Sequence, residues 1–193
     1  MSTTRRGNLI VISGPSGAGK TSICDELLRR IPRSRWSVSV TTRPPRGKEV
    51  DGQAYHFVSP EEFARMRSQG ALLESAEYLG NWYGTPRGPV EEALARGESI
   101  VLEIDVQGGA QIAREIPESI RVFVLPPTMA TLKARLEGRH TESEALQAKR
   151  LAEADGEIAF ARGSGCYDFF VTNDILEDSV QRIMDIVRSR ETA

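Results

Sequence analysis

Hydrophobic residues near the start of the chain follow two different periods. Residues 9–12 form a continuous apolar run, which is typical of a strand buried on both faces of a parallel sheet. Apolar residues between positions 23 and 31 recur every three or four positions, which predicts a helix that ends at Pro32. Apolar and hydroxyl side chains then alternate over residues 36–41, and this period of two predicts one strand with a hydroxyl-lined face.

Strands and helices continue to alternate along the rest of the chain, which predicts an α/β fold with a central parallel sheet and helices on both faces. Further strands are predicted at residues 55–58, 72–74, 100–105, 120–125 and 167–172. Further helices are predicted at residues 59–70 and 89–96, from about 106 to 115, from 128 onwards and at 176–187. Residues 80–86 predict a turn-rich loop with two aromatic side chains. Between residues 40 and 86 short β elements surround one helix. This departure from the regular alternation of strand and helix predicts an inserted subdomain.

Composition narrows the possible classes of protein. A chain of 193 residues fits one α/β domain, and its formal net charge of −2 argues against a general nucleic-acid binder. Cys24 and Cys166 lie far apart and form no metal-binding or redox motif, which indicates a reducing compartment. With only His56 and His140 available, a zinc site is not expected. Because no leader or membrane-spanning apolar run is recognisable, we expect a cytoplasmic protein with no membrane partner.

The most informative segment is a glycine-rich loop between the first predicted strand and helix. Gly14-Pro15-Ser16-Gly17-Ala18-Gly19-Lys20-Thr21 fits the P-loop pattern G-x-x-x-x-G-K-[ST]. Glycines let successive backbone N–H groups turn toward an anion at the helix N-terminus. Lys20 is expected to reach the β- and γ-phosphates of a nucleoside triphosphate, and the Thr21 hydroxyl to bind Mg²⁺. The alternative is an ordinary glycine-rich turn, but the order of strand, loop and helix favours a triphosphate site.

Charged residues elsewhere have a functional and a structural interpretation. Arg43 and Arg46 lie in a proline-stiffened loop, where two guanidinium groups suit a phosphate dianion, although they could also be solvated loop charges. Asp105 follows a buried strand and is expected to hold Mg²⁺ or one of its waters, or to cap the next helix. The arginines of the segment from Thr128 onwards either line a lid over the triphosphate or lie on a solvated helix face. These arginines are Arg135, Arg139, Arg150 and Arg162.

Together the motifs resemble the guanylate kinase family over nearly the whole chain. The matching segments are the P-loop, SVSVTTRPPR at 37–46, YHFVS at 55–59, GNWYGT at 80–85, LEIDVQG at 102–108, RLEGR at 135–139 and Asn173-Asp174. The resemblance implies a reversible transfer of the γ-phosphoryl group of ATP to GMP, which gives ADP and GDP. It also implies that Mg²⁺ accompanies ATP, that GMP or dGMP is the acceptor, and that no nucleic acid is bound.

The resemblance further assigns roles to residues. GMP is expected to contact Ser39, Arg43, Arg46, Tyr55, Glu74, Tyr83, Thr85 and Glu103, with Ser39, Glu74 and Thr85 at the guanine. ATP is expected to contact residues 14–21 and Asn173, and the metal to lie near Thr21 and Asp105. The groups expected to act on the transferred phosphoryl are Lys20, Arg43, Arg135, Arg139 and Arg150. The Glu74 carboxylate can accept both donors of the guanine edge, whereas adenine would leave it unpaired, a discrimination of roughly 10⁴-fold.

The resemblance also implies a division of the single domain, residues 1–193. The core would comprise residues 1–39, 87–127 and 164–193, the GMP-binding subdomain about 40–86, and the lid about 128–163. Three positions depart from the family pattern, namely Trp82, His140 and Ile175, and the last of these concerns adenine contact.

Two other functions compete with this one. A non-catalytic guanylate-kinase-like binding module would have a degraded P-loop, whereas Gly19-Lys20-Thr21 is intact. A related kinase for a different phosphorylated acceptor would have no use for Ser39 and Glu74 together. Whether the chain is a monomer or a homo-oligomer does not follow from its sequence.

Overall fold

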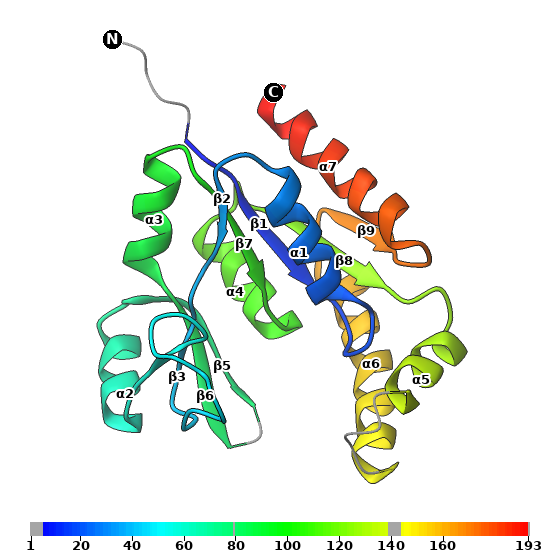
Figure 1. The fold of residues 1–193 in the computed structure, drawn as a ribbon, viewed down its shortest axis with the longest axis horizontal. Coiled ribbons are helices and arrows are strands. Elements are labelled where there is room, and N and C mark those ends of the chain that lie inside the picture. Colours follow the sequence, from blue (N-terminus) through cyan, green and yellow to red (C-terminus); the bar gives the residue numbers. More distant parts are fainter. Residues whose placement is uncertain (1–5, 79, 139–143, 193) are drawn as a thin grey trace.

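A five-stranded parallel sheet forms the centre of the molecule, in a computed structural model that describes residues 6–78, 80–138 and 144–192 (Figure 1). Its strands, in spatial order, are β2 (Ser34–Trp36), β7 (Ser99–Glu103), β1 (Leu9–Ser13), β8 (Ile120–Leu125) and β9 (Phe169–Thr172). Every neighbouring pair in this sheet is parallel. The predicted α/β fold with a central parallel sheet is therefore confirmed.

Alternate residues of β1 point into two separate hydrophobic cores. Ile10 and Ile12 pack against α1 (Lys20–Arg30) and α7 (Leu176–Thr192) on one face of the sheet. Leu9 and Val11 pack on the other face, against α3 (Arg87–Ala95) and α4 (Val106–Glu115). Because both faces of the strand are covered, its continuous apolar run is explained, and the helices form layers on the two sides of the sheet.

A second, smaller sheet has the spatial order β4-β3-β6-β5, and we call it the small sheet. Its strands are β3 (Val40–Thr41), β4 (His56–Phe57), β5 (Leu72–Tyr78) and β6 (Asn81–Pro86), and α2 (Pro60–Ser68) packs against it. In Figure 1 the small sheet and α2 lie at one end of the molecule. All of these elements fall between residues 40 and 86, the segment in which an inserted subdomain is predicted.

Two of the predicted elements are wrong in this region. Residues 36–41 do not form one strand, because β2 ends at Trp36 in the large sheet and β3 begins at Val40 in the small sheet. Residues 80–86 are not a loop, since β6 occupies most of them and pairs antiparallel with both β3 and β5. Glycine is required at position 84 of this strand, because a Cβ there would lie too close to its neighbours. It would be 2.9 Å from the Glu74 carbonyl oxygen and 3.2 Å from the Phe63 ring.

Strand β5 is anchored in two cores at once. Leu72 packs into the small core with Val40 and Phe63, whereas Leu73 packs into the α3–α4 side of the large sheet. The register between β5 and β6 shifts between Leu72 and Glu74, which is the signature of a β-bulge. A bulge changes the direction in which side chains point, and here it sends consecutive leucines into different cores.

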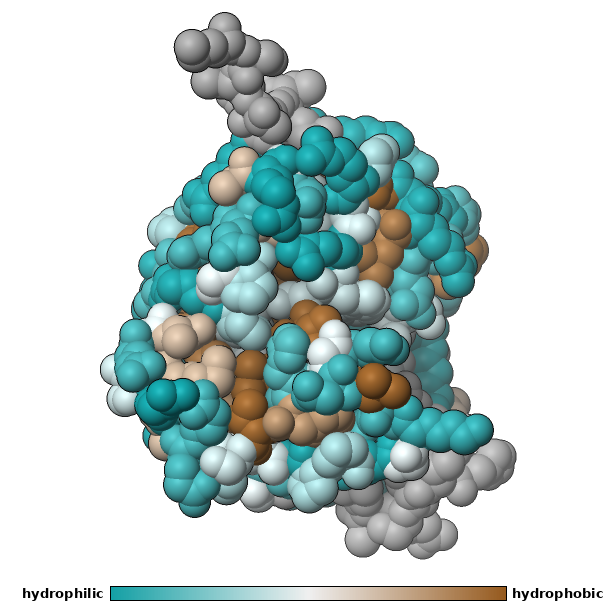
Figure 2. Space-filling view, turned by 60° about the vertical axis from the view of Figure 1, so that its left-hand side comes forward, coloured by the Kyte–Doolittle hydropathy of each residue, from teal (hydrophilic) through white to brown (hydrophobic). Residues whose placement is uncertain are grey.

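Helices α5 (Met129–Glu137) and α6 (Glu144–Ser164) lie at the other end of the molecule in Figure 1. Leu132 and Leu136 of α5 pack against Ala154 of α6, and both leucines also lie close to Gly17. No helix in the described part of the chain is long and apolar enough to cross a membrane. The face drawn in Figure 2 is mostly hydrophilic, and the described hydrophobic residues on it form small groups rather than one broad patch.

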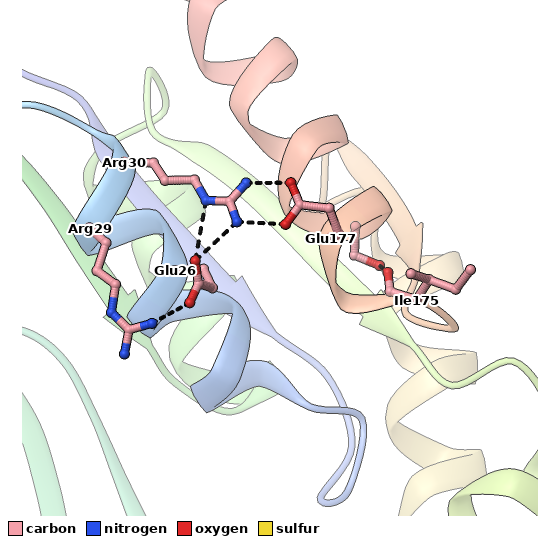
Figure 3. A network of polar contacts seen from close by, with 6 residues as sticks. Glu26, Arg29, Arg30, Ile175 and Glu177 are labelled. Atoms are coloured by element: carbon pink, nitrogen blue, oxygen red, sulfur yellow. Dashed lines mark hydrogen bonds and ion pairs between the residues drawn. The ribbon is translucent and has the colours of Figure 1, made fainter.

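Ion pairs join the first helix to the last (Figure 3). Arg30 on α1 donates to both carboxylate oxygens of Glu177 on α7, at 2.7 and 2.6 Å, and also to Glu26 at 3.0 Å. Arg29 pairs with the other oxygen of Glu26. These contacts are partly solvated, so they fix the relative position of α1 and α7 more than they add stability.

Candidate functional site

The candidate site is a cavity of about 700 Å³ at the carboxyl ends of β1 and β7. In open parallel sheets, ligands bind at this edge where the strand order reverses, and here β1 has β7 on one side and β8 on the other. The cavity lining includes residues of the P-loop, of the β2–β3 connection, of β7 and of α6, among them Gly14, Ser16, Lys20, Thr21, Ser39, Tyr55, Glu103, Asp105, Arg150, Glu153 and Glu157.

The P-loop has the backbone that its sequence predicts. Gly14 and Gly19 have φ angles of 146° and 90°, a region that side chains rarely adopt. A Cβ on Gly14 would also lie 2.3 Å from the Val124 carbonyl oxygen. The Lys20 ammonium donates to the carbonyls of Gly14 at 2.7 Å and Pro15 at 3.1 Å, so its charge lies over the loop at the start of α1. Cationic charge and a helix N-terminus together favour an anion here.

Asn173 lies behind this loop rather than in the open cavity. It is buried, and its side-chain amide donates to the Ala18 carbonyl at 2.8 Å. A Cβ on Gly19 would lie 2.3 Å from the same amide nitrogen. Arg135 donates to the Asn173 carbonyl at 3.1 Å. The structure thus places Asn173 where it holds the loop in shape.

Oxygen-bearing side chains meet beside the P-loop. The Thr21 hydroxyl donates to Glu103, at 2.9 and 3.1 Å from its two carboxylate oxygens. Asp105 accepts from the Gly108 amide at 2.8 Å and so caps α4, as the structural interpretation of its position predicts, while it also lines the cavity. Among the described residues no group of three or more His, Cys, Asp or Glu could hold a metal by itself. These hard oxygen donors suit Mg²⁺ bound largely through phosphates and waters.

A side pocket of about 270 Å³ extends the main cavity toward the small sheet. Ser39, Tyr55, Glu103 and Asp105 line both spaces, so the two spaces adjoin each other. Glu74 lines the side pocket, and the Thr85 hydroxyl donates to its carboxylate at 2.6 Å. Burial raises the pKa of Glu74 to about 7, with the Thr85 hydrogen bond acting against the shift and the charge of Asp105 adding to it.

The predicted phosphate-binding residues lie in β6 and in the segment between β3 and β4. Arg43 is buried and makes a two-pronged ion pair with Glu49, at 3.0 and 2.9 Å. Its guanidinium lies 5.3 Å from the centre of the Tyr55 ring, and the Tyr55 and Tyr83 rings are 5.9 Å apart. Hydrogen bonds with Arg43 lower the pKa of Glu49. Arg46 contributes a backbone N–H to Glu49 at 2.7 Å.

Helix α6 points charged groups of both signs at the P-loop. Arg150 donates to the Ser16 hydroxyl, and Glu153 and Glu157 line the same cavity. Burial raises the pKa of Glu157 to about 7, whereas the nearby charge of Lys20 opposes that shift. Arg139 lies outside the described residues.

Sequence reasoning missed three acids of this region. Glu49, Glu153 and Glu157 carry no motif, although Arg150, Glu153 and Glu157 are spaced three and four apart and thus share one face of a helix. That spacing could have indicated a functional helix face. The pairing of Glu49 with Arg43 lies within one loop and has no comparable signal.

Comparisons with known proteins agree on one family. A scan against protein-family models matches residues 6–190 to the family described as guanylate kinase. A guanylate kinase of Synechocystis is 46% identical to this chain and covers 98% of it, with 97% of the relative covered. A guanylate kinase of Desulfitobacterium hafniense is also 46% identical, with coverage of 94% and 89%. The crystal structure of guanylate kinase from Anaplasma phagocytophilum superposes with a TM-score of 0.77 at 33% identity, covering 98% of this chain and 88% of that one.

Proposed function

The chain belongs to the guanylate kinase family, and from this premise we propose how its residues carry out phosphoryl transfer from ATP to GMP. The enzyme is an ATP:GMP phosphotransferase, and its products are ADP and GDP. The assignment of single residues below is our proposal.

GMP binds between the small sheet and the end of β7. The Glu74 carboxylate accepts the N1–H and 2-amino donors of guanine, with Ser39 and Thr85 beside it. Arg43, Arg46, Tyr55 and Tyr83 hold the phosphate, and the guanidinium forks supply paired donors to its oxygens. For this contact the Arg43 guanidinium exchanges part of its pairing with Glu49 for pairing with the phosphate.

ATP binds with its phosphates on the P-loop, where Lys20 shifts from the loop carbonyls toward the β- and γ-phosphates. Mg²⁺ would be held by Thr21 together with substrate phosphates, and Asp105 and Glu103 would lie close enough to this site to accept hydrogen bonds from metal-bound waters. When bound, the metal neutralises phosphate charge. Asn173 supports the loop, and so it contributes to ATP binding through Ala18 and Gly19.

In the transfer step an α-phosphate oxygen of GMP attacks the γ-phosphorus of ATP in line. The new P–O bond forms as the bond to the β-phosphate oxygen breaks, and that oxygen leaves as ADP. The attacking phosphate is already ionised, so no general base is required. Lys20, Arg135, Arg139 and Arg150 act by neutralising charge as the phosphoryl group moves.

One observation carries this assignment. The buried Glu74–Thr85 pair lies at a side pocket that shares lining residues with the P-loop cavity, which supports binding of the guanine base next to the phosphates. A coupled assay of ADP release from MgATP, with GMP, AMP, CMP, UMP or no acceptor, tests it. We expect fast turnover with GMP alone, loss of that preference in Glu74→Ala, and near-complete loss of turnover in Lys20→Ala. A Glu74→Ala enzyme with the preference of the wild type would refute the role of Glu74.

A further inference from the structure

Strand β5 lies at the edge of the small sheet, with β6 on its only strand-paired side. A residue on such an edge has backbone N–H and C=O groups that no strand satisfies. Gln111 of α4 satisfies both groups of Ser75, the residue directly after Glu74. The Ser75 N–H donates to Oε1 of Gln111 at 3.0 Å, and Nε2 of Gln111 donates to the Ser75 carbonyl at 2.9 Å.

The same helix also determines the space behind Glu74. Gly108 lies three residues before Gln111 and so on the same side of α4. A Cβ on Gly108 would lie 2.8 Å from Oε2 of Glu74 and 3.3 Å from its carboxyl carbon. Only a residue without a side chain therefore lets the carboxylate occupy its position. The Gly108 amide is itself held by the Asp105 cap, at 2.8 Å.

We propose that Gln111 is a positioning residue for guanine recognition, holding the β5 backbone against α4 so that the Glu74 carboxylate stays over Gly108. The inference rests on the proposed role of Glu74 as the base reader. Glu74 thereby takes its position from a helix of the large sheet, although its strand belongs to the small sheet. Without the side-chain amide of Gln111, the Ser75 backbone would exchange two fixed hydrogen bonds for water, and β5 would lose its polar contacts with α4 directly beside Glu74.

Steady-state kinetics of the Gln111→Met variant test the proposal, since methionine keeps the length of the side chain and removes both hydrogen bonds. We expect kcat/KM for GMP to fall roughly tenfold, with KM for ATP within about twofold of the wild type. We do not expect kcat/KM for AMP to fall by the same factor, so the ratio of kcat/KM for GMP to kcat/KM for AMP should decrease. Gln107→Met is the matched control, because Gln107 is an exposed glutamine one turn earlier on α4, outside both cavities, and it should behave as the wild type.

The Glu74→Ala background separates positioning from general damage. If Gln111 acts through Glu74, Gln111→Met should cause no further loss of GMP kinetics in Glu74→Ala. A loss as large as in the wild-type background, or unchanged GMP kinetics in the single variant, would overturn the proposal. If Glu74→Ala alone keeps the wild-type preference for GMP, then Glu74 does not recognise guanine. That result would refute the proposed function of Glu74, and it is distinguishable from a failure of the proposal for Gln111.

If Gln111→Met does not fold, a second variant and hydrogen exchange still test the proposal. Gln111→Asn keeps the amide but shortens it by one methylene, so its effect on kcat/KM for GMP should be intermediate. Hydrogen exchange at the Ser75 amide should be faster in both variants than in Gln107→Met, because its acceptor is displaced or lost. Unchanged protection of Ser75 would contradict the inference.

Discussion

At the scale of single residues, Glu74 is a carboxyl group whose charge depends on pH near neutrality. Glu74 is only 6% exposed, and this burial raises the pKa of its carboxyl group to about 7. A neutral carboxyl group cannot accept both donors of guanine, because one of its oxygens carries a proton. In the proposed role of Glu74, GMP binds to the ionised form, and binding below neutral pH includes the loss of a proton.

We expect KM for GMP to rise as the pH falls from 8 to 6, most steeply below about pH 7, where Glu74 becomes protonated. Kinetics over this range at saturating MgATP provide the measurement. Glu74→Gln should have a higher KM throughout but a flatter pH dependence, since its amide does not titrate. An identical slope in both enzymes would assign the pH dependence to another group, such as Glu157 or the phosphate of GMP.

The same pKa shift affects stability with a definite sign. The ordinary pKa of this carboxyl group is 4.5, so between pH 4.5 and about 7 the folded state keeps a proton that the unfolded state has released. The free energy of unfolding therefore falls as the pH rises through that window. At pH 8, Glu74→Gln should be more stable than the wild type by on the order of 1–3 kcal/mol.

Urea denaturation of the two proteins at pH 8 and pH 5 measures this difference. The advantage of Glu74→Gln should shrink toward zero at pH 5, where both folded proteins carry an uncharged side chain at this position. An advantage of equal size at both pH values would show that buried charge is not its cause.

What the sequence predicts at this scale is the type of residue at each position. Arg43 and Thr85 lie within segments that match the family, whereas Glu74 lies outside them and takes its expected role from the family resemblance alone. The motifs do not single out Glu49 or Gln111, whose partners are defined by how loops and helices meet. A glutamine on an amphipathic helix has the same local pattern whether it faces water or an edge strand.

At the scale of elements, periodicity reports which way a side chain faces but not which sheet it joins. The alternation over residues 36–41 is real, yet β2 and β3 belong to different sheets, and Ser39 between them lines both cavities. Gly80 directly before β6 and Gly84 within it are residues typical of turns, and they concealed the strand. Gly84 is needed there because Phe63 and the Glu74 backbone leave no room for a side chain.

The bulge in β5 yields a prediction at this scale. Leu73→Ala should lower the free energy of unfolding by about 2–5 kcal/mol, because Leu73 is buried in the extensive α3–α4 core. Leu72→Ala should cost less, since Leu72 packs with only Val40 and Phe63 among fully buried residues. Urea denaturation compares the two variants, which remove the same atoms from neighbouring positions. A larger loss in Leu72→Ala would contradict the assignment of the two leucines to separate cores.

At the scale of the whole molecule, the site is assembled from three parts. The P-loop follows β1 of the large sheet, Glu74 lies in β5 of the small sheet, and Arg150 lies on α6. The sequence predicts the P-loop between a strand and a helix as the structure has it, whereas residues 36–41 and 80–86 are predicted wrongly. The distances between the three parts depend on tertiary packing, and hence the division into core, GMP-binding subdomain and lid stays a prediction.

Two nucleotides with closely spaced phosphates should draw these parts together, because Arg43 and Arg150 then share anionic partners. We expect the radius of gyration measured by small-angle X-ray scattering to decrease when GMP and a non-hydrolysable ATP analogue are added with Mg²⁺. Each nucleotide alone should produce a smaller decrease. An unchanged radius with both nucleotides present would mean that the site is already closed in the free protein.

The hydrogen bond from Asn173 to Ala18 has a consequence for how the protein is made. Synthesis proceeds from the N-terminus, so the P-loop leaves the ribosome before β9 and α7 do. Its support from Asn173, and the Arg30–Glu177 pair that fixes α1, come from the last part of the chain. A nascent or prematurely terminated chain that ends before β9 therefore carries a complete nucleotide-binding motif without the contacts that shape it. We therefore expect the P-loop to take up its ATP-binding shape only after β9 and the start of α7 have been made.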